Sequence, residues 1–193
     1  MRKSIECGYS HAGTAPGEMG ISWRQKQAAY RKGYNGEEHM LTRLLVEHDH
    51  ILKTLNLLEM QFLDLCRGGT PDFSLMRSIL EYIQEYPEQI HHPFEDKIFS
   101  ILLERVDEVE LIQELIAEHT ELETETRKIR ESLKLLESGA VSPEDIMKLL
   151  SAFLIRQRQH MYIEEEKVHP LIESALTEED WEHVQSAVPL YKG

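Results

Sequence analysis

Two stretches of this chain carry the same arrangement of histidine and glutamate. Each has a lone histidine on an apolar helical stripe, and a His-x-x-x-Glu pair follows 43 residues later in the first copy and 41 in the second. The members are His48, His91 and Glu95 in the first copy and His119, His160 and Glu164 in the second. Equivalent residues are 71, 69 and 69 positions apart. The fold must therefore accommodate two similar halves, each of which supplies two imidazoles and one carboxylate.

From residue 37 onward, apolar residues recur at steps of three and four, which is the period of an amphipathic helix. We predict long helices over residues 37–66, 73–105 and 107–137, and a fourth that opens at Ser142-Pro143 and carries its apolar stripe to Leu171. A short helix over residues 178–187 is expected to close one end. Because the connections are short, neighbouring helices should be antiparallel, so the predicted fold is all-α, an up-down-up-down four-helix bundle.

Residues 1–36 lack helical periodicity and are expected to form an irregular N-terminal arm. The bundle is predicted over residues 37–189, and residues 190–193 form a tail. Asp and Glu outnumber Lys and Arg by 35 to 21, for a net charge of −14. Such an acidic chain is a poor partner for nucleic acid or an anionic membrane, because both are polyanions.

The chain shows no sign of export or membrane insertion. No apolar run approaches the roughly 18–20 residues of a membrane span, and the N-terminus does not have the pattern of a secretory signal. The two cysteines form no Cys-x-x-Cys motif. We therefore expect a cytoplasmic protein without a disulfide framework.

The predicted helices place the four histidines at about one height, because antiparallel neighbours run past each other in opposite directions. Residues four apart on a helix project side by side, so each His-x-x-x-Glu pair offers a nitrogen and an oxygen to one region. We predict a buried centre of two iron ions with these six residues as ligands and both carboxylates bridging. Mixed imidazole and carboxylate ligands suit iron, with manganese or zinc as alternatives, and an oxo or hydroxo group is expected as a further bridge.

Other features bear on this prediction. Pro87 and Pro93 fall within the second predicted helix, so that helix should be kinked or should begin near Pro87. His50 and His92 point away from the ligand face of a regular helix, and we expect both to be exposed. His169 and His183 are expected beyond the level of the metal. Three tyrosines could donate hydrogen bonds around the centre or simply pack in the core: Tyr82, Tyr86 and Tyr162.

The chain resembles the hemerythrin-like family, the HHE cation-binding domains, over about residues 37–189. The motifs that carry the resemblance are Glu47-His48, the string from His91 to Asp96, Glu118-His119, and the string from His160 to Glu165. The segments Leu176-Thr177 and Asp180-Trp181 resemble the family's closing region. The resemblance implies a non-haem di-iron centre. Similar proteins bind dioxygen, respond to oxygen or iron, or take part in the repair of iron–sulfur centres.

Two positions depart from the oxygen-carrying hemerythrins. Those proteins have a second histidine four residues from the one that resembles His119, where this chain has Leu115 and Glu123. This difference puts an oxygen-carrier role in doubt, and leaves Glu123 as either an extra oxygen ligand or a solvated residue. In the fourth helix the internal repeat favours Glu164 as the ligand, whereas the hemerythrin spacing would select Glu165.

The function expected from the sequence is a di-iron protein that binds or senses dioxygen, nitric oxide or peroxide, or that holds iron. The first alternative is an oxidoreductase that acts on peroxide or nitric oxide at the same centre. The second is a metal-free helical interaction module. The sequence alone does not identify a protein partner.

Overall fold

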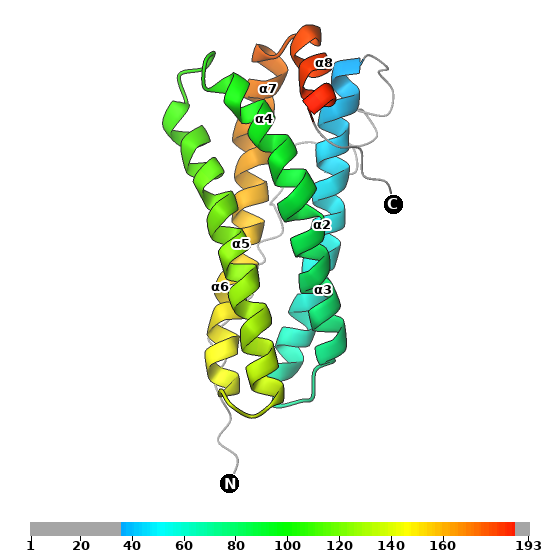
Figure 1. The fold of residues 1–193 in the computed structure, drawn as a ribbon, viewed down its shortest axis with the longest axis vertical. Coiled ribbons are helices and arrows are strands. Elements are labelled where there is room, and N and C mark those ends of the chain that lie inside the picture. The colour runs from blue at the N-terminus through cyan, green and yellow to red at the C-terminus, as the bar shows by residue number, and fades with distance from the viewer. Residues whose placement is uncertain (1–35, 188–193) are drawn as a thin grey trace, which may run out of the picture.

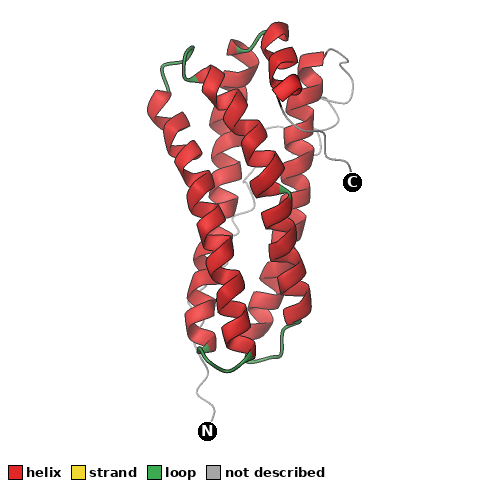
Figure 2. Cartoon of the chain, in the orientation of Figure 1, coloured by secondary structure: helices red, strands yellow, loops and turns green. Residues whose placement is uncertain are grey.

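The computed structural model describes residues 36–187, and this part of the chain contains helices and no strand (Figure 2). The predicted N-terminal arm up to residue 35 and the predicted tail lie outside the described residues. The elements are α2 (Gly36–Cys66), α3 (Phe73–Glu85), η1 (Pro87–His91), α4 (His92–Leu102), α5 (Val109–Glu137), α6 (Pro143–Ile163), η2 (Glu164–Val168), α7 (His169–Ala175) and α8 (Glu178–Ala187). The elements η1 and η2 are single π-helical turns.

Four helical columns stand side by side, formed by α2, by α3 with η1 and α4, by α5, and by α6 with η2 and α7 (Figure 1). Around the bundle, α2 packs against α3 and α6, and α5 packs against α3, α4 and α6. The short α8 contacts α2 and α4 at one end. The predicted all-α helical bundle is confirmed. No helix among residues 36–187 has the length and apolar character needed to cross a bilayer.

The helix ends follow from local sequence. Gly68 after α2 and Gly139 after α5 have φ values of 72° and 73°, a region that glycine enters without steric cost. Asp72 caps α3 by accepting a hydrogen bond from the Leu75 amide at 2.9 Å. At the far end, Arg105 bonds Asp180 at 2.5 and 2.7 Å and so ties α8 to the segment that follows α4.

The second column is interrupted where the prolines predicted a kink. The π-turn η1 ends as the His92 amide donates to the Pro87 carbonyl, five residues back, and Pro93 then occupies the first turn of α4. A second π-turn, which was not predicted, ends in the same way: the His169 amide donates to the Glu164 carbonyl, and Pro170 follows. A π-turn adds a residue to one helical turn and changes which side chains point inward.

The core has two apolar clusters, one on each side of a polar level. The first is built from residues such as Ile51, Leu55, Ile83, Ile129 and Leu154. The second contains Leu44, Phe94, Leu115, Val168 and Trp181. In each column the polar level lies where the chain passes from one cluster to the other. The six predicted ligands lie at this level, so both ends of the centre are closed by packed hydrocarbon.

Candidate metal centre

The structure brings all six predicted ligands together in the middle of the bundle. His48 comes from α2, His91 from η1, Glu95 from α4, His119 from α5, His160 from α6 and Glu164 from η2. Each of them is at most 5 % exposed. Burying two carboxylates at this depth is unfavourable unless cations or protons compensate their charge.

One half of the centre is formed by His48 and His91, and we call it the His48–His91 half. Glu95 Oε1 lies 3.3 Å from His48 Nε2 and 3.2 Å from His91 Nε2. Glu164 Oε2 lies 3.4 Å from His48 Nε2. This half therefore gathers two imidazole nitrogens and one oxygen from each carboxylate.

The other half is formed by His119 and His160, and we call it the His119–His160 half. Glu164 Oε1 lies 3.5 Å from His119 Nε2 and 3.1 Å from His160 Nε2. Glu95 Oε2 lies 3.6 Å from His119 Nε2. Each carboxylate thus presents one oxygen to each half, which is the arrangement needed to bridge two cations.

The outward Nδ1 atom of each of the four predicted ligand histidines meets a further carboxylate. The pairs are Glu47 with His91 at 2.8 Å, Asp96 with His119 at 2.8 Å, Glu118 with His160 at 2.9 Å, and Glu165 with His48 at 3.0 Å. Each pair joins two neighbouring columns, and together the four close a ring around the bundle. These four residues, which we call the outer carboxylates, each adjoin a ligand in sequence and repeat at the same offsets as the ligands.

The outer carboxylates determine how the imidazoles face. A neutral histidine that donates its Nδ1 proton outward keeps the lone pair of Nε2 directed inward, and this is the usual arrangement of a metal-binding histidine with its supporting carboxylate. The four outer carboxylates therefore hold the imidazoles so that four Nε2 atoms face the two central carboxylates. No outer carboxylate was assigned this role from the sequence, although the repeated spacing was a signal for it.

Glu47 is the most strongly held of the four. It accepts hydrogen bonds from Arg43 Nε at 2.7 Å and from the Tyr86 hydroxyl at 2.8 Å, besides the bond to His91. The Arg43 guanidinium also lies over the Phe94 ring, 4.3 Å from its centre. Of the three tyrosines that could donate near the centre, Tyr86 does so, whereas Tyr162 is exposed.

The charges of the centre are tightly linked. Burial opposes the charged form of every group, but nearby carboxylates outweigh it at two histidines. Asp96, Glu164 and Glu95 raise the pKa of His119 to about 9, and Glu164, Glu118 and Glu95 raise the pKa of His160 to about 10. At Glu95 and Glu164, burial and the repulsion between the two carboxylates would raise the pKa. The neighbouring histidines have a stronger opposite effect and hold both pKa values well below the usual range. Protons and cations therefore compete for the same imidazoles, so cation binding should release protons.

The hydrogen bonding of the central atoms tests whether the site fits cations. Among the described residues, no hydrogen-bond partner satisfies Glu95 Oε2, His119 Nε2, His160 Nε2 or either oxygen of Glu164. Buried polar atoms are normally paired, and five such atoms facing one another are costly. Nitrogen and oxygen donors held in this way fit divalent or trivalent cations.

The structure also settles the places of the neighbouring residues. Glu164 faces the interior, whereas Glu165 bonds to His48 from outside. His50 is exposed, as expected, and His183 is exposed on α8. Glu123 is paired with Arg127 at 3.6 Å and its side chain is 43 % exposed, in agreement with a solvated residue.

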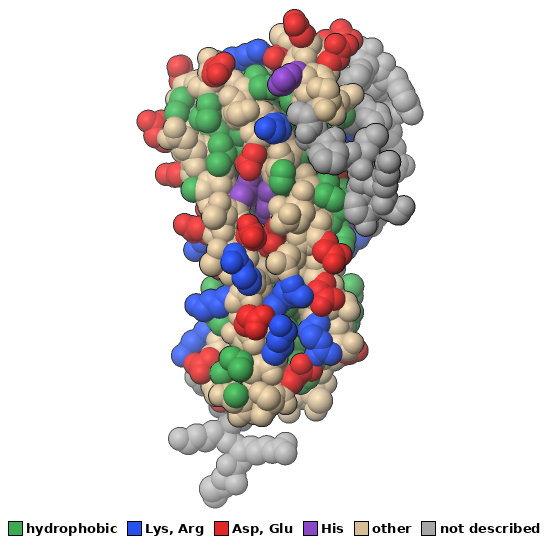
Figure 3. Space-filling view, viewed as in Figure 1, with side chains coloured by type: hydrophobic (Ala, Val, Ile, Leu, Met, Phe, Trp, Pro, Cys, Tyr) green, Lys and Arg blue, Asp and Glu red, His purple; other side chains and the backbone are tan. Residues whose placement is uncertain are grey.

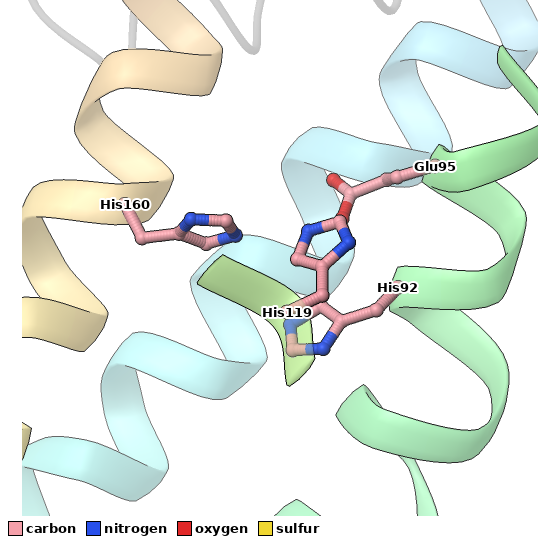
Figure 4. Close-up of side chains that lie close together, drawn as sticks. All are labelled: His92, Glu95, His119 and His160. Carbon is pink, nitrogen blue, oxygen red and sulfur yellow. The ribbon is translucent and has the colours of Figure 1, made fainter. Parts of the chain in front are cut away.

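Two of the expectations about histidines are wrong. His92 was expected to be exposed, but it is buried, and its ring stacks on His119 with centroids 4.2 Å apart (Figure 4). The expectation assumed the rotation of a regular helix, and the π-turn before His92 changes that rotation. His169 was expected beyond the metal level, but it follows the second π-turn and stacks on His48 at 5.9 Å. Burial and the neighbouring histidines lower the pKa of both.

The comparison with protein families agrees with this geometry. A family model described as the hemerythrin HHE cation binding domain matches residues 37–178. The chain belongs to this family. The hemerythrin-like domain thus extends over all four columns, and it carries histidine and glutamate clusters that could hold a metal ion. No match was found among the curated proteins or among the solved structures.

Proposed function

We propose that this hemerythrin-like protein binds two iron ions and uses them to bind or sense a small ligand, namely dioxygen, nitric oxide or peroxide, or to hold iron. The observation that supports the proposal is the pairing of the two halves. Each half presents two Nε2 atoms and one oxygen from each of Glu95 and Glu164. The contacts between these nitrogens and oxygens measure 3.1 to 3.6 Å. The proposal assigns one cation to each half and a bridging role to both carboxylates.

Different residues of the chain have different roles around such a centre. The inner nitrogens and oxygens bind the cations, and the outer carboxylates hold the imidazoles in the orientation for binding. The apolar clusters above and below exclude bulk water, which limits both loss of the cations and unwanted side reactions. When bound, a pair of iron ions supplies reversible redox chemistry and vacant coordination positions for a small ligand. Manganese and zinc remain alternatives for the same donor set.

Metal analysis of the purified protein, combined with an ultraviolet–visible spectrum, tests the proposal. We expect about two iron ions per chain and charge-transfer bands in the near ultraviolet. His119→Ala should sharply lower the metal content, because it removes a donor that faces both central carboxylates. His50→Ala is the matched control, since His50 is an exposed histidine on α2, and it should leave the content unchanged.

Two outcomes would contradict the proposal. Retention of both ions by His119→Ala would reject the ligand assignment. Protein that is free of metal after growth in iron-rich medium would instead favour a helical interaction module. Stopped-flow mixing of the iron-loaded protein with peroxide or nitric oxide then distinguishes the candidate functions. Repeated turnover would indicate an oxidoreductase, and a single stoichiometric reaction would indicate binding or sensing.

A further inference from the structure

One buried histidine at the centre has no part in the ligand set described so far. His92 is the first residue of α4 and is 5 % exposed. Among the described residues it makes no hydrogen bond through either ring nitrogen, whereas each ligand histidine is tied to a carboxylate. Neither ring nitrogen is among the fully buried atoms that lack a partner, so both keep some access to solvent and neither is committed to another group of the described residues.

His92 lies nearest to one half of the centre, although its ring also approaches His91 of the other half, with centroids 5.7 Å apart. Its ring is nearly parallel to that of His119, with an angle of 4° between the planes, and lies edge-on to His160 at 5.7 Å. In Figure 4, His92 and Glu95 project from α4 toward the space that His160 approaches from the opposite side. One donor atom from each of His92, Glu95, His119 and His160 falls within 4.8 Å of the others.

The unsatisfied atoms are concentrated in the same half. In the His119–His160 half, all four inner atoms lack a hydrogen-bond partner among the described residues: Nε2 of both histidines, Oε2 of Glu95 and Oε1 of Glu164. In the His48–His91 half, only Glu164 Oε2 is in this condition. The half with the most unpaired donors is therefore the one that His92 adjoins.

His169 provides an internal comparison. Like His92, it follows a π-turn, precedes a proline and is buried, and its ring stacks on a ligand histidine, in this case His48. However, the centroids are 5.9 Å apart instead of 4.2 Å. The donor group of that half contains His48, His91 and Glu95 without His169.

We propose that His92 is a fifth nitrogen donor of the centre, reserved for the cation in the His119–His160 half, so that the two cation positions have unequal affinity. This inference rests on the proposed function, because it concerns the same pair of cations. The His119–His160 position would have three nitrogens and two oxygens, and the His48–His91 position two of each. The additional donor should make the first of these positions the tighter one.

Stepwise titration of the metal-free protein with cobalt(II) tests this proposal, followed by calorimetry and by visible absorption, which reports donor number and geometry. His92→Phe retains a ring that can stack on His119 but removes both nitrogens. We expect the tighter step to weaken by at least about tenfold, the scale found when even an outer partner of a metal ligand is lost. The weaker step should be unchanged, and the absorption of the tighter position should shift toward that of the weaker one.

Two further variants separate ligation from packing. His169→Phe makes the equivalent change beside His48 and should leave both steps unchanged. His92→Ala creates a space beside His119, and free imidazole should restore its tighter step. Thermal melts of the metal-free variants check that each is folded.

The proposal is overturned if His92→Phe binds both ions as the wild type does, if His92→Phe and His169→Phe weaken the two steps alike, or if imidazole has no effect on His92→Ala. Failure of the proposed function has a different signature, because the wild-type protein itself would then bind no cobalt.

Discussion

The two halves of the centre are built from equivalent positions of a repeat, yet their surroundings differ. In the His48–His91 half, the side chains of the outer carboxylates Glu47 and Glu165 are 8 % and 23 % exposed. In the His119–His160 half, those of Glu118 and Asp96 are 35 % and 40 % exposed. Figure 3 shows histidine side chains reaching the surface between α4 and α5 on this second side.

The difference separates what the repeat determines from what the surroundings determine. Both copies supply the same inner donors, and Glu95 and Glu164 belong to both halves at once. The outer carboxylates, in contrast, differ between the halves. In the His48–His91 half, Glu47 is buried and hydrogen-bonded to Arg43 and Tyr86, whereas the outer carboxylates of the other half contact solvent. Changes to the inner carboxylates should therefore affect the two halves equally, whereas changes to the outer carboxylates should not.

The largest effect is expected from the shared carboxylates. Glu95→Gln and Glu164→Gln each remove a negative charge that both halves share and replace one of the two oxygen donors with an amide NH2 group, while conserving side-chain volume. We expect the iron content to fall from about two ions per chain to fewer than about one in either variant, because metal sites of this kind form only with their full charge and donor set. Inductively coupled plasma analysis of purified variants measures this content.

Glu123→Gln is the control for the shared carboxylates, since Glu123 is a partly exposed glutamate on α5 whose ion-pair partner is Arg127. A loss of only one ion in Glu95→Gln, with the other fully retained, would show that the halves do not share this bridge.

An intermediate effect is expected from the outer carboxylates, and here the halves should differ. Glu47→Gln disrupts a buried group that accepts from His91, Arg43 and Tyr86. We expect cation affinity to fall about 10–100-fold, the usual consequence of losing such a partner. Glu118→Gln changes a half-exposed carboxylate beside His160, where water can replace the lost bond, and should cost only a few-fold. Competition with a coloured chelator measures both affinities, and equal losses would contradict the comparison.

The gathering of the six inner residues could be predicted because it depends on regular features. Helical periodicity gives the four columns, short connections make them antiparallel, and the offsets of 71 and 69 residues place the copies at one height. The choice of Glu164 over Glu165 followed from the same repeat. These inferences needed only the regular rise of a helix and the projection of residues four apart.

The places of His92 and His169 could not be predicted in this way. Both depend on π-turns, which alter the angle between successive residues by an amount that no local propensity indicates. Pro87 and Pro93 signalled an irregularity in the second column but not its type. In the fourth column, Pro170 was the only comparable signal, and it lies beyond the π-turn itself. The pairing of each outer carboxylate with a histidine on the next column required the packed bundle.

The smallest effect concerns another pair of equivalent positions, 69 residues apart: Glu88 in η1 and Gln157 in α6. Both are buried, and among the described residues neither Glu88 oxygen has a hydrogen-bond partner. Burial, with a contribution from Glu123, raises the pKa of Glu88 to about 7, against the opposing effects of Thr126, Arg127 and Arg130. In the unfolded chain the same carboxyl group titrates near its ordinary value.

Glu88→Gln gives both copies the same residue and should change how stability depends on pH. Because the folded state holds the Glu88 proton to higher pH than the unfolded state, the wild-type free energy of unfolding falls as pH rises from about 4.5 to 7, and the loss persists above pH 7. Glutamine carries no such charge, so Glu88→Gln should be more stable than wild type at pH 8 by about 1 kcal/mol, a value discounted for screening by solvent and the nearby arginines. At pH 4.5 most of this gain should be absent. Urea unfolding of the metal-free proteins at both pH values measures the difference, with Glu131→Gln on the exposed face of α5 as control; a gain that is the same at both pH values would show that the charge of Glu88 does not distinguish the two copies.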